Sequence, residues 1–468
     1  MATLEQPELD PLPPVPDIAL ASASESELKV LAAVTATASS SGGAPSTDAA
    51  HTDAPRTEAL RTVAPRTEAL RTTVPHTAAS RTAAPRADTT RTAALSPEAP
   101  RAAPGSAHEA SRGQQQPGIT PAIATIGVRT DQDPEGKRPN LTVLGAGSYG
   151  TALAMAVATK GTPVLLWSHR PAQAHELAQA RMNAQYLPGI LFPPSLSVTS
   201  DLKAALAFSK DLLLVVPSSA FVASLQELKQ YLTPSHRLVW ATKGFESHTG
   251  ALLSEVVEQE LDPLNIPLAA LSGPTFAREL AQGLPTAIAC AGTDQKFVDD
   301  VCKLLHTPTF RVYQSHDLLA LQIGGAVKNV IAIGAGMSDG LGYGANARTA
   351  LISRGLAEMI RLGIALGASE RGFMGLSGLG DLMLTCTDNQ SRNRRLGFML
   401  GQGKNIEEAL AQIGQVVEGY HMVHVVDKLA QSKGVEMPIC HELYEVIVNH
   451  KNGAQAARDL LSRALTSE

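Results

Sequence analysis

The pattern of hydrophobic and polar positions changes character near residue 139. After Asn140, short apolar runs alternate with segments of helical length. The runs that predict strands are Leu141–Leu144, Pro163–Trp167, Asp211–Val216, Leu238–Ala241 and Leu268–Leu271. After about Gln322 the segments become long and helical, with many small residues. The pattern predicts a doubly wound α/β domain over residues 139–322 and an all-α domain over residues 323–468.

Residues 1–138 follow neither pattern. They are rich in Ala, Thr, Pro, Ser and Arg, and the nine residues APRTEALRT occur from Ala54 and again from Ala64. Each unit of about ten residues contains one proline and few large apolar groups, so a disordered extension is predicted. It is either a tether, a partner-binding arm or a spacer, or a low-complexity expansion without a role.

Composition excludes several classes of partner. The formal net charge is -5, with both signs interspersed, so neither nucleic acid nor an anionic membrane is expected as a partner. The longest apolar stretch, around Ile323 to Met337, is interrupted by Gly, Lys and Asn, and we expect no membrane span. Four cysteines without C-x-x-C spacing predict no disulfide framework and no metal site.

The N-terminal residues predict a cytoplasmic protein. They have neither a basic region nor a continuous apolar stretch of the kind found in secretory signals. An organelle transit peptide in the Arg- and Thr-rich segment is the alternative.

A glycine-rich turn follows the first predicted strand. Gly145, Gly147 and Gly150 stand in Gly-Ala-Gly-Ser-Tyr-Gly, directly before a helical segment over Thr151–Ala158. Gly145 suits a tight turn, Gly147 lets the backbone approach a pyrophosphate, and Gly150 permits close helix–strand packing. The α/β part is therefore predicted to be a Rossmann-type dinucleotide-binding domain. A glycine turn that binds nothing is the alternative.

The second strand indicates which dinucleotide is bound. It ends in Ser168-His169-Arg170 instead of the acidic residue that binds a ribose 2′-hydroxyl. A hydroxyl, an imidazole and a guanidinium suit a 2′-phosphate, so the cofactor is NADPH or NADH, with NADPH favoured. Solvent-facing loop residues would look the same.

Polar groups interrupt the helical part in two places. Lys328 lies within an apolar, glycine-containing helix, where burial would lower its pKa and permit proton exchange near neutral pH. Asp381, in Gly-Leu-Gly-Asp, could hydrogen-bond that lysine, and Ser391-Arg392-Asn393 at a helix start could bind phosphate. A snorkelling lysine, a helix cap at Asp381 and a solvated basic face over Arg392 to Arg395 remain open.

Together these residues identify a family resemblance. From Leu141 to about Arg463 the chain closely resembles the bacterial NAD(P)-dependent glycerol-3-phosphate dehydrogenases. The motifs that carry the resemblance are intact and in order: Gly145–Leu153, Trp240–Gly244, Ser272–Ala277, Gly325–Asn329, Gly378–Asp381 and Ser391–Asn393.

The resemblance implies reversible reduction of dihydroxyacetone phosphate to sn-glycerol 3-phosphate, which supplies glycerophospholipid synthesis. It implies Lys328 as the general acid/base, oriented by Asp381 and kept low in pKa by Lys243. The implied cofactor contacts are Gly145, Gly147, Ser148, Tyr149, Gly150, His169, Arg170, Lys243, Ala277, Arg392, Val416 and Glu418. The implied substrate contacts are Lys243, Gly273, Thr275, Lys328, Asp381, Ser391, Arg392 and Asn393. A homodimer is expected, and no metal is required.

Two other functions remain to be separated from this one. A β-hydroxyacid or 6-phosphogluconate-type dehydrogenase also joins a Rossmann domain to a helical domain with a catalytic lysine. A cofactor-binding sensor without enzymatic activity is the other alternative.

Overall fold

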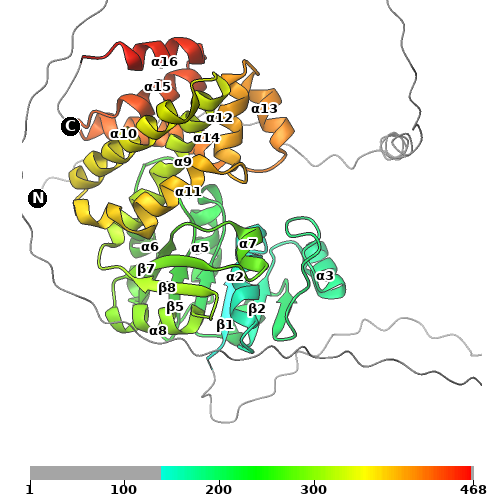
Figure 1. Ribbon diagram of the computed structural model, residues 1–468. Coiled ribbons are helices and arrows are strands. Elements are labelled where there is room, and N and C mark those ends of the chain that lie inside the picture. The colour runs from blue at the N-terminus through cyan, green and yellow to red at the C-terminus, as the bar shows by residue number, and fades with distance from the viewer. Residues whose placement is uncertain (1–138, 465–468) are drawn as a thin grey trace, which may run out of the picture. The chain divides into compact units, whose positions relative to one another are not determined.

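The computed structural model of the protein describes residues 139–464 (Figure 1). The extension predicted to be disordered, residues 1–138, lies outside this part. The described residues comprise a sheet with its covering helices, followed by a helical domain. The predicted α/β-then-α fold class is confirmed for these residues.

The described strands form one eight-stranded sheet in the order β3-β2-β1-β4-β5-β6-β7-β8. Strands β1 to β6 are parallel, β7 runs antiparallel to β6, and β8 is parallel to β7. The order 3-2-1-4-5-6 is that of dinucleotide-binding domains. The strands are β1 Leu141–Leu144, β2 Val164–Trp167, β3 Leu196–Thr199, β4 Asp211–Leu214, β5 Arg237–Trp240, β6 Leu268–Ser272, β7 Thr286–Gly292 and β8 Phe310–Gln314.

Burial explains which strands the pattern predicted. Every residue of β1, β2, β4 and β6 is buried, as expected for parallel strands covered on both faces, and these strands read as continuous apolar runs. The predictions missed β3, β7 and β8. The strands β3 and β8 lie at the two edges of the sheet and carry exposed polar residues, so their apolar signal is weak.

Helices connect the strands of the sheet domain. They are α2 Ser148–Ala158, α3 Pro171–Ala180, α4 Leu202–Phe208, α5 Phe221–Lys229, α6 Leu253–Leu261, α7 Ala277–Ala281 and α8 Gln295–Leu305. Short 3-10 turns occur at Ser218–Ala220 and Asp262–Leu264. The helix predicted after the glycine turn is confirmed as α2, which packs against α7.

The helical domain is built around α9, Leu318–Gly340. The helices around it are α10 Gly344–Ala365, α11 Asp381–Thr387, α12 Arg392–Gly401, α13 Ile406–Ile413, α14 Glu418–Ser432, α15 Pro438–Ile447 and α16 Gly453–Leu461. A 3-10 turn at Glu370–Met374 and a π turn at Leu376–Gly380 precede α11. The helix α9 begins at Leu318, within a few residues of the predicted domain division at residue 322. The division itself stays a prediction.

Glycines let α12 lie against α9. A Cβ on Gly336 would stand 1.9 Å from the Arg394 carbonyl oxygen, and one on Gly397 would stand 1.8 Å from the Ile333 carbonyl oxygen. A side chain at either position would force the helices apart, and α12 would carry its first turn away from Lys328.

The length and hydropathy of α9 are those of a helix that could cross a membrane. However, 89% of that apolar stretch is buried inside the protein. Its apolar residues are therefore in contact with the surrounding helices and with β6, as in a core helix.

Candidate active site

The glycine turn forms a cradle that fits a dinucleotide. Gly145 has a φ of +123°, and a Cβ there would stand 2.2 Å from the Val215 carbonyl oxygen. A Cβ on Gly150 would stand 2.0 Å from the Gly145 carbonyl oxygen. Gly147, in contrast, has open space where a Cβ would be, directly before α2 begins at Ser148. The free N–H groups of the first turn of α2 can therefore receive a pyrophosphate.

The end of β2 offers two of the three groups expected for a ribose phosphate. The hydroxyl of Ser168 is buried and lies 2.7 Å from Gln173 Oε1, to which it donates, so it is already engaged. His169 is exposed and Arg170 is half-buried. The imidazole and the guanidinium remain as candidates.

Asp381 joins two lysines that come from different domains. Its Oδ1 accepts a hydrogen bond from Lys328 Nζ at 2.5 Å, and its Oδ2 accepts one from Lys243 Nζ at 2.6 Å. Lys328 lies in the middle of α9, Lys243 follows β5, and Asp381 begins α11. Lys328 also donates to Thr385 Oγ1 at 2.9 Å, and Lys243 donates to the Gly273 carbonyl oxygen at 3.1 Å. Each ammonium keeps one N–H for a ligand.

Burial and mutual charge set the pKa values of this group. Burial lowers the pKa of Lys328 to about 8, Asp381 opposes the shift, and the positive charge of Lys243 adds to it. Burial also works against the charge on Lys243, but the neighbouring Asp381 carboxylate raises its pKa above the usual value. Burial opposes ionisation of Asp381 too, yet the two lysines hold its pKa below the usual range. Lys328 is thus the member of the group that can exchange a proton near neutral pH.

The predicted phosphate-binding residues lie at the start of α12. The Ser391 hydroxyl caps this helix by accepting from the Arg394 N–H, and Arg392 is half-buried. Asn393 donates to Asn329 Oδ1 at 2.8 Å and accepts from the Gly419 N–H at 2.9 Å. Its amide is therefore held rigidly beside the helix that carries Lys328.

One alternative for the basic run is wrong. Arg394 does not belong to a solvated face, because it is 8% exposed and its guanidinium lies 2.5 Å from Asp339 Oδ2. The carboxylate of Asp339 also binds Arg348. The ion pair of Arg394 with Asp339 therefore connects α12 to the end of α9.

Four other predicted contacts lie on or next to α2, α7 and α14. The Lys243 ammonium lies 5.9 Å from the ring centroid of Tyr149, and Ala277 begins α7, which packs on α2. Glu418 begins α14 and accepts from Asn329 Nδ2 at 3.2 Å. Val416 is exposed just before that helix.

Sequence reasoning assigned no role to two residues of the site. Thr385 stands four residues after Asp381, on the same face of α11, and this spacing was a usable signal. Asn329 follows Lys328 directly and connects Asn393 with Glu418. Its role depends on the packing of three helices, which spacing does not reveal.

The sheet has the strand order of dinucleotide-binding domains, and the helices that follow it carry a buried lysine. This arrangement is that of nicotinamide-dependent dehydrogenases. The comparisons with known proteins give the family. Residues 140–298 match the NAD-dependent glycerol-3-phosphate dehydrogenase N-terminus, and residues 317–458 match the C-terminus of the same family. The chain belongs to the NAD-dependent glycerol-3-phosphate dehydrogenase family, and the predicted resemblance is confirmed.

Individual relatives agree. The chain is 58% identical over 330 residues to the glycerol-3-phosphate dehydrogenase [NAD(P)+] of Edwardsiella ictaluri, covering 70% of this chain and 97% of the relative. It is 57% identical over 333 residues to that of Escherichia coli, covering 71% and 98%. The crystal structure of glycerol-3-phosphate dehydrogenase from Coxiella burnetii matches with a TM-score of 0.67 and 43% identity, covering 70% and 99%. The chain is an oxidoreductase that uses NAD or NADP.

Proposed function

We propose that this chain reversibly reduces dihydroxyacetone phosphate to sn-glycerol 3-phosphate, with Lys328 as the general acid/base. The observation that carries the proposal is the Lys243–Asp381–Lys328 array. The pKa of Lys328 is lowered to about 8, which suits proton exchange, whereas the pKa of Lys243 is raised and its ammonium stays charged. Family membership supports the substrate, since the relatives are named for it.

The residues of the chain divide the work of the reaction. When bound, the reduced nicotinamide supplies the hydride for the ketone carbon. Lys328 donates a proton to the ketone oxygen as that oxygen gains negative charge. Lys243 stays protonated and polarises the same oxygen, and Asp381 holds both ammonium groups in position.

The phosphate of the substrate requires a second set of groups. We assign it to Arg392 and to the polar residues on either side, Ser391 and Asn393, at the positive end of α12. Thr275 and the backbone at Gly273 lie on the sheet side, next to Lys243. Fixing the phosphate sets the distance between the ketone and the nicotinamide, on which the transfer depends.

The pKa of Lys328 predicts opposite pH dependence for the two directions. Reduction needs the ammonium, so its kcat should fall as the pH rises through about 8. Oxidation of glycerol 3-phosphate needs the neutral amine, so its kcat should rise over the same range. Initial rates of both directions between pH 6 and pH 10 would check this, and parallel profiles would contradict the role of Lys328.

The substrate itself is tested by initial rates with the full chain. NADPH should be oxidised with dihydroxyacetone phosphate. A β-hydroxyacid or 6-phosphogluconate, offered with NADP+, should not be oxidised. Absence of turnover with dihydroxyacetone phosphate would overturn the proposal, and turnover of a hydroxyacid alone would favour the alternative dehydrogenase class.

NADPH is proposed as the preferred cofactor because His169 and Arg170 stand at the end of β2. Replacing Arg170 with alanine should raise the KM for NADPH about tenfold, as for loss of a charge-assisted hydrogen bond, and leave that for NADH nearly unchanged. Arg311→Ala is the control, since Arg311 is exposed on β8 at the opposite edge from the β2–β3 side of the sheet. Equal effects of Arg170→Ala on both cofactors would argue against a phosphate contact.

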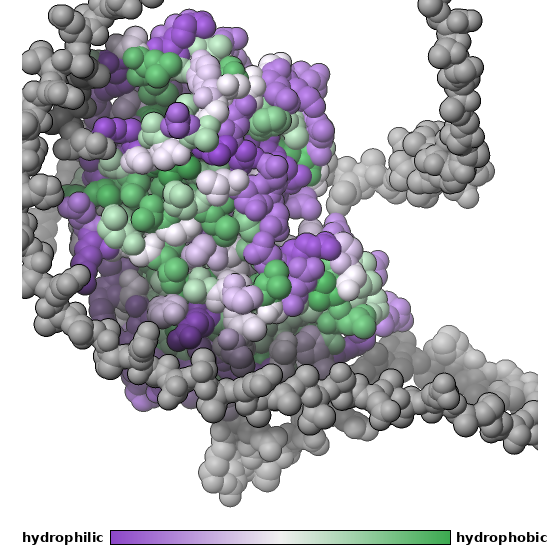
Figure 2. All heavy atoms as spheres, viewed as in Figure 1, coloured by the Kyte–Doolittle hydropathy of each residue, from purple (hydrophilic) through white to green (hydrophobic). Residues whose placement is uncertain are grey.

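A homodimer and a cytoplasmic location complete the proposal. Apolar side chains gather over the region of α10 and α11 in Figure 2, and Ile364, Met374 and Met383 are 53%, 56% and 43% exposed. Between these helices lies a hollow of about 210 Å³. An exposed apolar surface of this kind is suited to pairing with a second copy. The mass of the full chain measured by light scattering tests the homodimer.

A further inference from the structure

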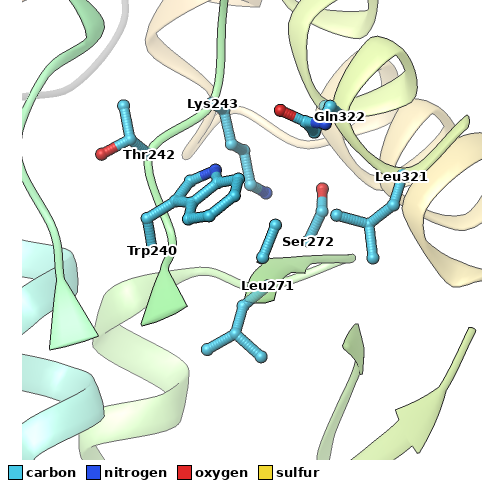
Figure 3. A pocket seen from close by; sticks show the side chains of 9 residues that line it. Trp240, Thr242, Lys243, Leu271, Ser272, Leu321 and Gln322 are labelled. Atoms are coloured by element: carbon cyan, nitrogen blue, oxygen red, sulfur yellow. The ribbon is translucent and has the colours of Figure 1, made fainter. Parts of the chain in front are cut away.

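A small cavity lies beside Lys243, between the ends of β5 and β6 and the first turns of α9 (Figure 3). It measures about 10 Å³, which is close to the ~10–15 Å³ that one water molecule requires. Its lining residues are Trp240, Thr242, Lys243, Ala270, Leu271, Ser272, Leu321, Gln322 and Gly325. The space is too small for a substrate or cofactor group and matches a single water molecule.

Two of the lining residues carry polar atoms that lack a partner within residues 139–464. Trp240 is fully buried, and its indole Nε1–H donates to no atom of this part of the chain. Ser272 is 2% exposed, and its Oγ is likewise without a partner there. Buried polar groups of this kind are normally satisfied by protein or by ordered water.

Gln322 supplies a third polar group whose orientation is determined. Its Oε1 accepts from the Ser254 N–H at 3.0 Å, and its Nε2 donates to Ser254 Oγ at 2.9 Å. Oε1 retains a second lone pair. One donor, one hydroxyl and one acceptor are the combination that a buried water can satisfy, because water donates two hydrogen bonds and accepts two.

The cavity borders the stem of Lys243. A Cβ on Gly325 would stand 2.8 Å from Ser272 Oγ and 3.5 Å from Lys243 Cγ, so the missing side chain of this glycine leaves the space open. In Figure 3 the Lys243 side chain extends along the cavity toward Ser272. The contents of the cavity therefore determine where the lysine stem can lie.

We propose that Trp240, Ser272 and Gln322 hold one buried water molecule, and that this water is a positioning element for Lys243. Trp240 donates to the water oxygen, and the water donates to Gln322 Oε1 and Ser272 Oγ. The filled cavity keeps the lysine stem extended, so that the ammonium stays on Asp381 and faces the ketone oxygen. This role rests on the proposed function, whereas the water site itself does not.

The water is tested directly by NMR of the full chain labelled with ¹⁵N-tryptophan. The chain has two tryptophans and so two indole signals, which a Trp167→Phe variant assigns. The Trp167 indole donates to the Ser200 carbonyl oxygen at 3.2 Å and serves as the internal control. The indole N–H of Trp240 should show a nuclear Overhauser cross-peak to a water molecule that tumbles with the protein, and that of Trp167 should not. Absence of this cross-peak at Trp240 would overturn the water site, whatever the activity of the protein.

The positioning role is tested by two substitutions of equal size. Ser272→Thr keeps the hydroxyl, whereas Ser272→Val replaces it with a methyl group, and both add the same second branch. The valine variant should lose the water cross-peak and lower kcat/KM for dihydroxyacetone phosphate about threefold to tenfold, with a loss in kcat, because Lys243 no longer polarises the ketone oxygen. The threonine variant should keep the cross-peak and a kcat/KM near that of the parent.

The pH profile separates positioning from general damage. When Lys243 moves away in the valine variant, Lys328 loses a repelling charge, so the inflection of the reduction profile should move to higher pH. Equal kinetics and equal profiles of the threonine and valine variants would overturn the positioning role. A parent protein that shows the cross-peak but no turnover would instead contradict the proposed function and leave the water site standing.

Discussion

Replacing Lys328 with alanine should lower kcat for the reduction of dihydroxyacetone phosphate about 10²- to 10⁴-fold, the contribution typical of a positioned general acid. Burial and Lys243 lower the pKa of this lysine to about 8, which suits it to the proposed role of proton donor. Without its ammonium, the oxygen that gains charge has only Lys243 beside it. The KM should change less than kcat, because the proposed phosphate contacts at Arg392 and its neighbours are left in place.

Two measurements make this result specific. The inflection near pH 8 should disappear from the residual rate of the variant, and added small primary amines should restore part of kcat by entering the space that the side chain leaves. Lys160→Ala is the control, since Lys160 is an exposed lysine that donates to the carbonyl oxygens of Leu304 and His306 outside the site. Activity of Lys328→Ala comparable to that of the parent would refute the assigned role.

Replacing Asp381 with asparagine should damage both activity and stability. The carboxylate is 1% exposed and binds two ammonium groups, so its loss leaves two like charges facing each other without an opposite charge between them. Breaking such a buried network by removing one partner typically costs about 3–5 kcal/mol. Both lysines should then lose protons at lower pH, and reduction at neutral pH should fall with them.

The pH at which this loss appears follows from the sign of the shift. The lysines lower the pKa of Asp381 in the folded protein, so its contribution to stability is present above the usual carboxylate range. It disappears only as the pH falls through the lowered value. Urea unfolding at neutral pH should therefore show the full difference between parent and variant, and acid conditions should reduce it.

Asp300→Asn is the matched control. Asp300 also connects two cations, Arg237 at 2.6 Å and Lys296 at 3.2 Å, but its side chain is 32% exposed. This pair is partly open to solvent, which screens it, so the variant should lose much less stability than Asp381→Asn and keep its activity. Similar losses for the two aspartate variants would mean that burial does not strengthen the Asp381 array.

The sequence alone determined the elements that depend on local geometry. Continuous apolar runs marked β1, β2, β4, β5 and β6, because strands covered on both faces need no polar alternation. Gly145 was identifiable as a turn position because a positive φ is open mainly to glycine. The order of the motifs along the chain then indicated the family. The family resemblance in turn indicated Lys243, Lys328 and the start of α12 as parts of the site.

Only the tertiary structure decided how these groups meet. Asp381 lies 138 positions from Lys243 and 53 from Lys328, and no periodicity in the chain predicts that one carboxylate binds both. The packing of α11 and α12 on α9 also placed Thr385 and Asn329 in the site. Packing also removed Ser168 from the groups predicted to bind a ribose phosphate, because its hydroxyl donates to Gln173. It excluded a solvated position for Arg394, because that side chain binds Asp339. Hydrogen bonds between distant segments depend on how whole helices pack, and side-chain spacing along the chain carries no record of that packing.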